Sequence, residues 1–273
     1  MSDFFSNLLY SAAPLILASI GALFTEFAGV VGTFMEGFIN MGAFFAWIIA
    51  VKTGSVLLGF VLCACMTSLC GWALARFVRK TGANPFVSGI ALNIAAEGLI
   101  NTLSTVWFGT KGVVRGIAPS GHFPSITVAL LAVAAAFVFI KYTRWGLALR
   151  ASGVSPLAAR ERGIQPGIYW EGAWAAAAFF AALAGASISQ RVGAYTPGGV
   201  AGRGWMSLAA VYLGFRNPVG VLAAALVFAL AERFSSILQG IEGIPASALL
   251  GIPSALAFVL YGFSHWLRWR RAV

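Results

Sequence analysis

The sequence predicts an all-α polytopic membrane protein with about eight or nine transmembrane or half-spanning helices. Of its 273 residues, 60% are hydrophobic and only 10% are charged, whereas a soluble domain carries about a quarter charged residues. The mean hydropathy is +0.88, and apolar runs of about 20 residues recur along the chain. These observations exclude a soluble enzyme, a disordered chain and a disulfide scaffold. The lack of short alternating segments excludes an outer-membrane barrel.

Nine apolar segments, separated by charges and by Pro or Gly, account for the expected helices. Their approximate limits are 8–24, 29–51, 55–75, 84–107, 125–142, 171–190, 203–215, 219–238 and 245–267. The seventh is too short to cross a hydrocarbon core of about 30 Å, so we expect a half-helix whose broken end is shielded by protein. Nothing interrupts the pattern, which predicts a single transmembrane domain over 1–273 with a long loop at about 143–170.

The lysines and arginines predict the orientation of the chain. Six of them fall on one side of the predicted spans and twelve on the other. The larger set is Arg76, Arg79, Lys80, Lys141, Arg144, Arg150, Arg160, Arg162, Arg216, Arg268, Arg270 and Arg271. Because cytoplasmic loops are enriched in Lys and Arg, this set predicts a cytoplasmic side, with the N-terminus outside and the C-terminus inside. The net charge of +10 is thus explained by topology, without nucleic acid binding.

The loop between the fifth and sixth segments is the least apolar part of the chain. Ser155 followed by Pro156 is a typical helix start, residues 157–162 favour helix, and Gly163 suits a left-handed stop. The pattern predicts a helix of about two turns that lies outside the bilayer. Two interpretations remain open: a surface turn that joins two spans, or a docking element for a partner protein.

Three groups of short motifs carry a resemblance to a known family. The loop contains GLALRASG at 146–153, PLAA at 156–159 and GI at 163–164; the N-terminal part contains FTEFAGVV at 24–31, MEG at 35–37 and GAF at 42–44; and AGA follows at 184–186. In these motifs the chain resembles the permeases of ATP-binding cassette (ABC) importers. The most similar group is the simple-sugar and nucleoside permeases, which are related to the branched-chain amino acid and ribose types.

The resemblance implies a type II ABC-importer-like permease of the bacterial cytoplasmic (inner) membrane. In that family the loop supplies a coupling helix that fits a groove of the cytoplasmic ATPase subunit. This role falls on Ser155, Pro156, Leu157, Ala158, Ala159, Arg160, Glu161, Arg162 and Gly163. The implied partners are ABC ATPase subunits, an extracellular or periplasmic solute-binding protein, and a second permease chain, with a heterodimer favoured over a homodimer. The implied solute is a nucleoside or a simple sugar, with a flavin such as riboflavin as a further candidate.

Two of the predicted membrane segments carry polar faces. Glu36 and Asn40 share one helical face, and Asn93, Glu97 and Asn101 form a ridge with the same spacing of four. The pentad Glu-Gly-x-Ile-Asn begins at Glu36 and again at Glu97, which suggests an internal repeat. A charge at mid-bilayer costs about 3 kcal/mol, so such residues usually face a cavity or a partner. Two interpretations remain open: these residues line the path of a polar solute, or they hold helices together inside the bundle.

No catalytic motif is present in the sequence. The four lysines follow Val51, Arg79, Thr110 and Ile140, so the Gly-Lys pair of a phosphate-binding P-loop is absent. Two histidines and a single aspartate offer neither a zinc site nor an aspartyl pair. We therefore expect no enzyme activity, no metal site and no cofactor in this chain. By the resemblance, ATP and Mg²⁺ bind to the partner ATPase subunits.

Two further hypotheses come from other functional classes. An ion-coupled secondary transporter would use Glu36 or Glu97 as its proton carrier. It explains the membrane carboxylates but gives the capped loop no purpose. A membrane scaffold that moves no solute is the third hypothesis. A stable complex with an ATPase, and uptake that survives collapse of the proton gradient, would exclude the secondary transporter.

Overall fold

The computed structural model describes residues 2–116, 124–200 and 202–238. These residues form ten helices: α1 (Ser2–Phe27), α2 (Met35–Thr53), α3 (Val56–Thr81), α4 (Pro85–Phe108), α5 (Ser125–Tyr142), α6 (Arg144–Val154), α7 (Pro156–Glu161), α8 (Pro166–Val192), α9 (Arg203–Leu213) and α10 (Pro218–Leu238). Within the described ranges, an isolated antiparallel bridge between Val114 and Tyr195 is the only β-type pairing.

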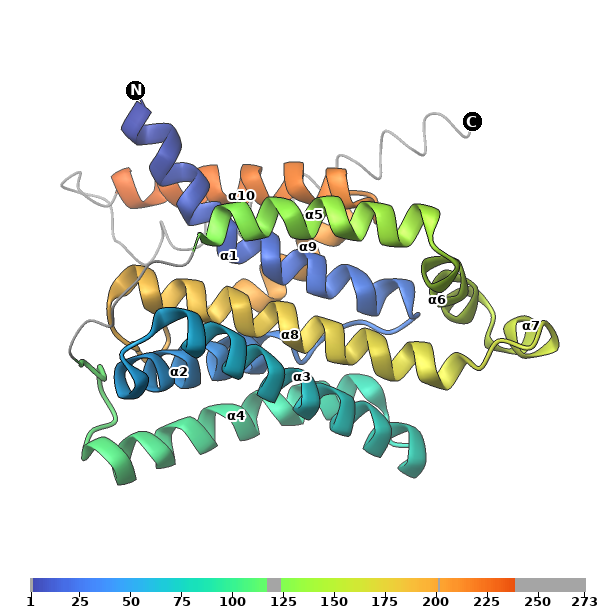
Figure 1. Cartoon of the computed structure of the whole chain (residues 1–273), viewed down its shortest axis with the longest axis horizontal. Helices are drawn as coiled ribbons and strands as arrows, with labels where there is room; N and C mark the ends of the chain where they lie inside the picture. Colours follow the sequence, from blue (N-terminus) through green and yellow to red (C-terminus); the bar gives the residue numbers. More distant parts are fainter. Residues whose placement is uncertain (1, 117–123, 201, 239–273) are drawn as a thin grey trace.

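Seven of the described helices are long and apolar enough to cross a membrane, namely α1 to α5, α8 and α10. They run along a common axis and alternate in direction from α1 to α8, whereas α8 and α10, which the short helix α9 separates, run the same way (Figure 1). This arrangement confirms the all-α polytopic fold. The predicted segment 245–267 lies outside the described residues.

The short helix α9 is the half-helix that the sequence predicts. Its 11 residues correspond to about 16 Å, roughly half of a hydrocarbon core. The helix packs on α1, α2 and α10. Its N-terminal end, where Gly204 is buried, is therefore covered by protein, as the broken end of a half-helix inside a membrane requires. Its C-terminal end instead leads into the exposed turn 215–217.

Helix α8 forms the centre of the bundle together with α1. It packs on α1, α2 and α3 (Figure 1), and its buried face consists mainly of alanine and glycine. A Cβ atom added at Gly185 would lie 1.9 Å from the carbonyl oxygen of Ile39, so only glycine permits this approach of α2 and α8. Small residues drive helix association in lipid because they allow close backbone packing. The bulk of this core comes from aromatic rings such as Trp174 and Phe34, whose centroids are 4.4 Å apart.

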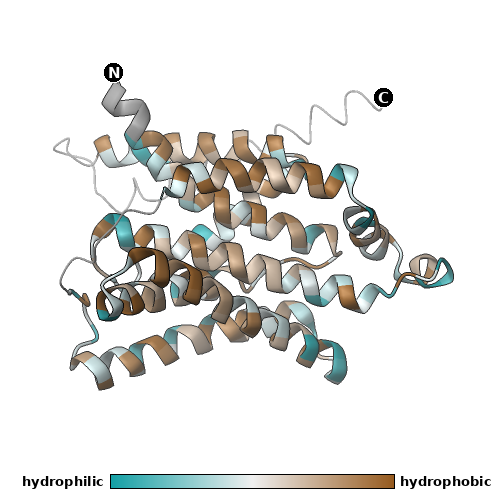
Figure 2. Cartoon of the chain, viewed as in Figure 1, coloured by the Kyte–Doolittle hydropathy of each residue, from teal (hydrophilic) through white to brown (hydrophobic). Residues whose placement is uncertain are grey.

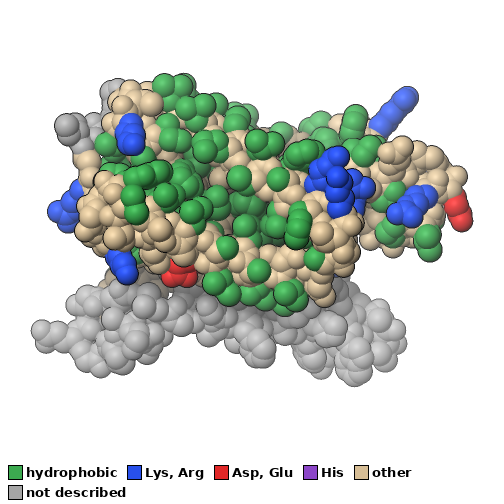
Figure 3. Space-filling view, turned by 90° about the horizontal axis from the view of Figure 1, so that it is seen from below, with side chains coloured by type: hydrophobic (Ala, Val, Ile, Leu, Met, Phe, Trp, Pro, Cys, Tyr) green, Lys and Arg blue, Asp and Glu red, His purple; other side chains and the backbone are tan. Residues whose placement is uncertain are grey.

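Charged side chains gather at the two ends of the bundle, and hydrophobic side chains cover the band between them, as Figure 2 and Figure 3 show. Two ion pairs fasten helices together at the end that carries α7. Arg79 Nε donates to Glu171 Oε1 at 2.7 Å and joins α3 to α8. The guanidinium of Arg216 lies 2.6 Å from Glu26 Oε1 and joins the α9–α10 turn to the end of α1.

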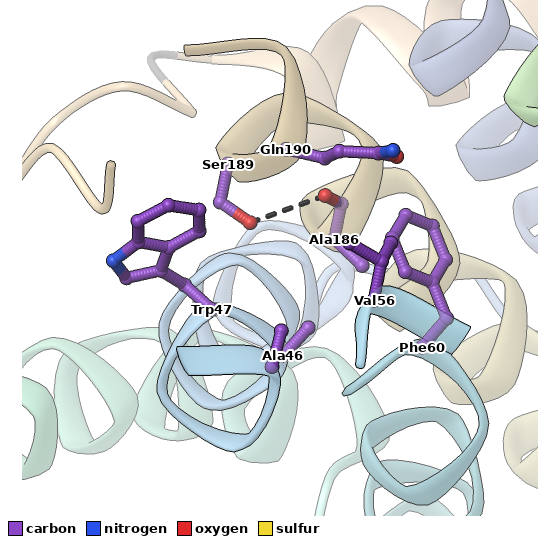
Figure 4. Close-up of a pocket in the computed structure, with 8 residues that line it drawn as sticks. Ala46, Trp47, Val56, Phe60, Ala186, Ser189 and Gln190 are labelled. Carbon is purple, nitrogen blue, oxygen red and sulfur yellow. Dashed lines mark hydrogen bonds between the residues drawn. The ribbon is translucent and has the colours of Figure 1, made fainter. Parts of the chain in front are cut away.

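A small cavity lies near the opposite end, between α2, α3 and α8 (Figure 4). Trp47, Val56, Phe60 and Ser189 line it, and the Ser189 hydroxyl donates to the Ala186 carbonyl at 3.1 Å. Its volume of 10 Å³ suits about one water molecule. This cavity is too small for a transported solute, so the polar residues of the membrane segments are the better candidates.

Candidate functional site

The short helix predicted at 155–163 is present as α7. The Ser155 Oγ accepts the backbone N–H of Ala158 at 3.3 Å, and Pro156 is the first helical residue. Gly163 follows the helix with a φ of +75°, the left-handed conformation that glycine adopts without strain. Cap, proline and glycine therefore act as the sequence predicts.

The predicted loop at about 143–170 contains a second helix, α6, which the sequence analysis did not identify. The Thr143 Oγ1 accepts the backbone N–H of Gly146 at 3.0 Å and caps this helix. A Cβ atom at Gly146 would lie 2.1 Å from the Phe139 carbonyl oxygen, so glycine allows α6 to fold back directly against α5. The buried residues of α6 are Gly146, Ala148, Leu149 and Ser152. The local sequence signal for this helix was the capping residue Thr143.

Helix α7 projects from the end of the bundle (Figure 1) and is largely exposed. The side chain of Leu157 is 73% exposed, and Ala158, Arg160, Glu161 and Arg162 are exposed as well. Ala159 is different, since only 2% of it is exposed. One buried alanine thus anchors a helix whose other side chains are free to contact a partner.

The helix pair α6–α7 is joined to the end of α1 by a contact between two glycines. A Cβ atom at Gly153 would lie 2.1 Å from the Phe27 carbonyl oxygen, and one at Gly29 would lie 2.7 Å from the Gly153 carbonyl oxygen. Ala28, Leu149 and Ala173 form a small apolar cluster beside this contact. Any shift of α6 must therefore displace the segment 28–34 that connects α1 to α2.

Glu36 lies at the other end of that connecting segment and holds the N-terminus of α9. Its Oε1 accepts the backbone N–H of Gly202 and its Oε2 that of Gly204, both at 2.7 Å. The α9 N-cap residue is Gly202, which has no side chain to satisfy these donors. A carboxylate at this position also interacts favourably with the helix dipole. Both oxygens of Glu36 thus serve to position the half-helix.

Asn93 performs a similar task at the start of α2. Its Oδ1 accepts the backbone N–H of Gly37 at 2.8 Å, and its Nδ2 donates to the carbonyl of Thr33 at 2.7 Å. The α2 N-cap residue, Phe34, offers no side-chain acceptor. An amide from α4 therefore caps α2 and fixes the two helices to each other.

Asn40 lies one turn beyond Glu36 on α2 and contacts the segment between α8 and α9. Its Oδ1 accepts the hydroxyl of Tyr195 at 3.2 Å. Tyr195 is buried, and its backbone pairs with Val114. Burial, followed by the negative charge of Glu97, raises the pKa of Tyr195 to about 12. The phenol consequently stays protonated at physiological pH and remains a donor to Asn40.

Glu97 and Asn101 are arranged differently from the other three polar residues. Glu97 is exposed at the middle of α4, and Asn101 is partly exposed one turn further on. Within the part of the chain that the structure describes, no hydrogen bond or ion pair engages either side chain. These two groups remain available to a solute or to a second chain.

The structure thus divides the residues predicted as one polar site into two sets. Glu36, Asn93 and Asn40 form hydrogen bonds inside the bundle, to the start of α9, the start of α2 and Tyr195 respectively. The side chains of Glu97 and Asn101 have no such partner among the described residues. A cluster of three side chains able to hold a metal ion does not occur among the described residues. Whether any of these residues contacts solute stays a prediction.

Sequence reasoning missed a polar cluster that joins α1 to α9. Glu26 accepts the hydroxyl of Tyr212 at 2.8 Å in addition to its pairing with Arg216. The sequence signal that could have identified Glu26 as part of a polar cluster was the presence of a carboxylate at the end of an apolar segment. Its partners lie about 190 residues further along the chain, as the sequence separation of 186 between Glu26 and Tyr212 shows, and no spacing rule links residues so far apart.

Residues 4–262 match the family described as branched-chain amino acid transport system / permease component. The chain belongs to this family. Because the match covers nearly the whole chain, it includes α7 and every polar residue discussed above. The family consists of transporter permease components, which are not themselves enzymes.

Several curated relatives extend this finding. The chain is 28% identical over 290 residues to the nucleoside ABC transporter permease protein NupC of Lactococcus lactis, covering 93% of this chain and 90% of that protein. It is 28% identical over 298 residues to the guanosine ABC transporter permease protein NupQ of Bacillus subtilis, covering 94% and 90%. A putative glucose ABC transporter permease protein of Haloferax volcanii is 28% identical over 282 residues, covering 92% and 82%. No solved structure matches.

These findings identify the chain as a transmembrane ABC permease of the simple-sugar and nucleoside type.

Proposed function

We propose that this chain is the permease subunit of an ABC importer that moves a nucleoside or a simple sugar into the cytoplasm, with a flavin such as riboflavin as a further candidate. The names of the relatives, which are nucleoside, guanosine and glucose permeases, support the first two solute classes. Separate ATPase subunits bind ATP and Mg²⁺ and contact α7. A second permease chain forms a heterodimer with this one, and a solute-binding protein delivers the solute from outside.

The exposed helix α7 is the observation that carries the proposal. A free helix of this kind, capped at its start and anchored by the buried Ala159, has no structural task within the described chain. Its surface offers the apolar side chain of Leu157 and charges of both signs at Arg160 and Glu161. Such a mixture suits a docking surface, because the apolar group supplies binding energy and the charges fix the orientation.

A chain of direct contacts leads from α7 to the membrane interior. Helix α6 carries α7 and contacts the α1–α2 connection where Gly153 meets Gly29. That connection leads to Glu36, which holds the first turn of α9. Movement of the docked helix would therefore shift the half-helix without unfolding any span. An ATPase that moves α7 on nucleotide binding could reopen or close a path in this way.

The position of Glu97 supports a solute path along α4. A carboxylate at mid-bilayer that faced lipid would be unfavourable by about 3 kcal/mol. A second permease chain that covered this face would remove Glu97 and Asn101 from lipid and create a polar surface between the two chains. Their carboxylate and carboxamide groups accept and donate hydrogen bonds, which matches the hydroxyl groups of a sugar or ribose.

The distribution of basic residues supports the orientation that this function requires. Arg79, Lys141, Arg144 and Arg216 belong to the end of the bundle that carries α7. By the positive-inside rule that end faces the cytoplasm, where ATPase subunits are present, and the N-terminus lies outside. The C-terminus is expected in the cytoplasm by the same rule.

The alternative of an ion-coupled secondary transporter has less support. Both oxygens of Glu36 already accept backbone N–H groups, and a proton carrier must release such bonds in every cycle. Glu97 remains a candidate carrier by its exposure alone. The family match favours coupling to ATP.

Two alanines of α7 allow a sharp test of the docking role. Ala158 is exposed and Ala159 is buried. We expect Ala158→Trp to lower uptake of labelled guanosine and glucose by at least about tenfold, since a bulky group at the centre of an interface removes more than 1.4 kcal/mol of binding. Thermal unfolding should be unchanged, and co-purification with the ATPase should weaken in parallel.

The control for this substitution is Ala134→Trp, which adds the same side chain at an exposed alanine of α5. It should leave uptake and ATPase binding intact. Ala159→Trp should instead destabilise the protein, because the new side chain has no room. Normal uptake and normal ATPase binding by Ala158→Trp would contradict the docking role.

A further inference from the structure

An apolar cavity of 490 Å³ lies between α5 and α8, near the end of the bundle that carries α7. Both helices pack on α1 and on α6, but they make at most marginal contact with each other. Phe24 of α1 contributes to its wall, and Trp145 and Leu149 of α6 line it as well. Figure 1 shows α1 between α5 and α8, with α6 across their ends. We call this space the α5–α8 cavity.

The α5–α8 cavity exists because small residues line the two helices that face it. Ala132, Ala135 and Ala136 lie on α5, and Gly172 and Ala176 lie on α8. A Cβ atom added at Gly172 would meet no other atom within 4 Å. Ala135 and Gly172 are exposed, so the cavity is open to the surroundings of the bundle.

The lining of the cavity suits a hydrocarbon chain. Its side chains are alanine, leucine, isoleucine and aromatic residues, and the Tyr169 hydroxyl is the only side-chain group among them able to hydrogen-bond besides the Trp145 indole. The rings of Trp145 and Tyr169 lie 5.6 Å apart at the α6 end, and Trp145 is 62% exposed. Tryptophan and tyrosine concentrate where lipid chains meet their headgroups. The cavity thus begins at headgroup level and extends into the apolar band.

Two cations lie where α5 meets α6 and a third lies further along α6, and within the described residues no ion pair engages any of them. Lys141, Arg144 and Arg150 carry them, and no Asp or Glu occurs between Ser125 and Arg160. Arg144 precedes Trp145, which lines the cavity, whereas the Lys141 ammonium lies over the rings of Phe137 and Tyr142 on the outer side of α5. The Nε of Arg150 is buried and has no hydrogen-bond partner. This corner therefore complements an anionic headgroup.

We propose that the α5–α8 cavity binds one anionic phospholipid, with an acyl chain in the cavity and the phosphate at the basic α5–α6 corner. Basic pockets between spans on the cytoplasmic side bind such headgroups in general. The lipid bridges α5 and α8, which do not pack on each other, and it contacts the first two turns of α6. Since α6 carries α7, lipid binding stabilises the position of the exposed helix.

Native mass spectrometry of the purified full chain tests this proposal. The protein is incubated with equal amounts of phosphatidylglycerol and phosphatidylcholine that carry the same acyl chains. We expect one phosphatidylglycerol per chain to be retained in preference to phosphatidylcholine. Arg144→Gln should reduce that preference about fivefold, the effect of one cation near a membrane surface.

A pair of neighbouring alanines provides the matched control. Ala134 and Ala135 are both exposed on α5, but only Ala135 lines the cavity. Ala135→Trp should abolish phosphatidylglycerol retention, and Ala134→Trp should preserve it. Gly172→Leu fills the cavity from the opposite helix and should repeat the loss, so the result does not depend on one variant.

Four outcomes overturn the proposal. The first is that the wild-type chain retains no lipid. The second is that it retains phosphatidylcholine and phosphatidylglycerol equally well, and the third is that Ala134→Trp and Ala135→Trp retain the same amount of phosphatidylglycerol. The fourth is that Ala135→Trp and Gly172→Leu change the proportion of dimer in the mass spectrum and leave the bound lipid unchanged. The cavity would then belong to a contact between two chains, and the lipid proposal would be wrong.

Discussion

Helices α2 and α4 carry the same pentad, Glu-Gly-x-Ile-Asn, but place it in opposite surroundings. In α2, Glu36 accepts two backbone N–H groups, Gly37 packs against Asn93, and the following Asn40 binds Tyr195. In α4, Glu97 is exposed and the glycine after it has open space beside it. One sequence pattern therefore supports helix packing in the first case and leaves a free polar face in the second.

The comparison teaches that the composition of a polar face does not fix its role in a membrane helix. Helix α2 is surrounded by α3, α4, α8 and α9, whereas the described contacts of α4 are mainly with α2. The first pentad is therefore enclosed, and burial obliges each polar atom to find a partner. In the second pentad, Glu97 and Gly98 lie on a face of α4 that no described helix covers, whereas Ile100 is buried. The number of neighbouring helices therefore decides whether a polar side chain serves helix packing or remains available to a solute or a second chain.

Replacement of each glutamate by alanine should give the largest difference between α2 and α4. Glu36→Ala leaves two backbone donors of α9 without acceptors, and we expect a loss of about 3 kcal/mol in stability, seen as lower expression and a lower midpoint of thermal unfolding. Glu97→Ala should change stability by no more than about 0.5 kcal/mol. Its uptake of labelled guanosine or glucose should fall about tenfold, because a charged hydrogen-bonding group is lost from the path.

The opposite pattern is equally informative. If Glu36→Ala is stable and inactive, Glu36 lines the path. If Glu97→Ala is as unstable as Glu36→Ala, the second pentad packs within the assembly and the proposed path along α4 is wrong.

The glycines should show a smaller difference of the same kind. A Cβ atom at Gly37 would lie 2.9 Å from Asn93 Oδ1 and 3.0 Å from Asn93 Cα, whereas one at Gly98 would meet nothing within 4 Å. Gly37→Ala should therefore destabilise the protein by about 2 kcal/mol, since it forces α2 and α4 apart. Gly98→Ala should stabilise α4 slightly, by up to about 1 kcal/mol, through helix propensity. Thermal unfolding in one detergent measures both, and equal midpoints would contradict the packing described for α2.

The asparagines should give the smallest difference. Asn40→Ala removes one hydrogen bond, that from Tyr195, and should lower stability by about 1 kcal/mol. Asn101→Ala should leave stability unchanged and reduce uptake only, because its side chain has no partner among the described residues. The variant Tyr195→Phe serves as a control, since it removes the same hydrogen bond as Asn40→Ala and should reproduce its midpoint of unfolding.

Local signals in the sequence predicted much of the fold. Asn84 before Pro85 marks the start of α4, and its Oδ1 accepts the backbone N–H of Phe86 at 2.9 Å. Ser155 and Gly163 delimit α7 in the same local way. Such signals act within one turn of helix, so they need no knowledge of neighbouring elements. Helix α6 has such a signal as well, because Thr143 caps its start. The polar composition of this stretch led to its interpretation as part of a loop.

The candidate site was less predictable than the fold. The sequence placed Asn93, Glu97 and Asn101 on one face of one helix, which is correct as geometry. It could not separate the capping role of Asn93 from the exposure of Glu97, because that distinction depends on where α2 begins. The Gly29–Gly153 contact was also invisible, since close backbone approach leaves no periodic pattern.

The sequence by itself determined the family and the approximate positions of the described membrane-spanning helices, because hydrophobic run length, capping residues and short motifs are local properties of the chain. Only the tertiary structure decided which carboxylate is enclosed and which is free, which alanine of α7 is buried, and where α5 and α8 leave a cavity. These features depend on distances between segments far apart in sequence, and packing alone fixes those distances.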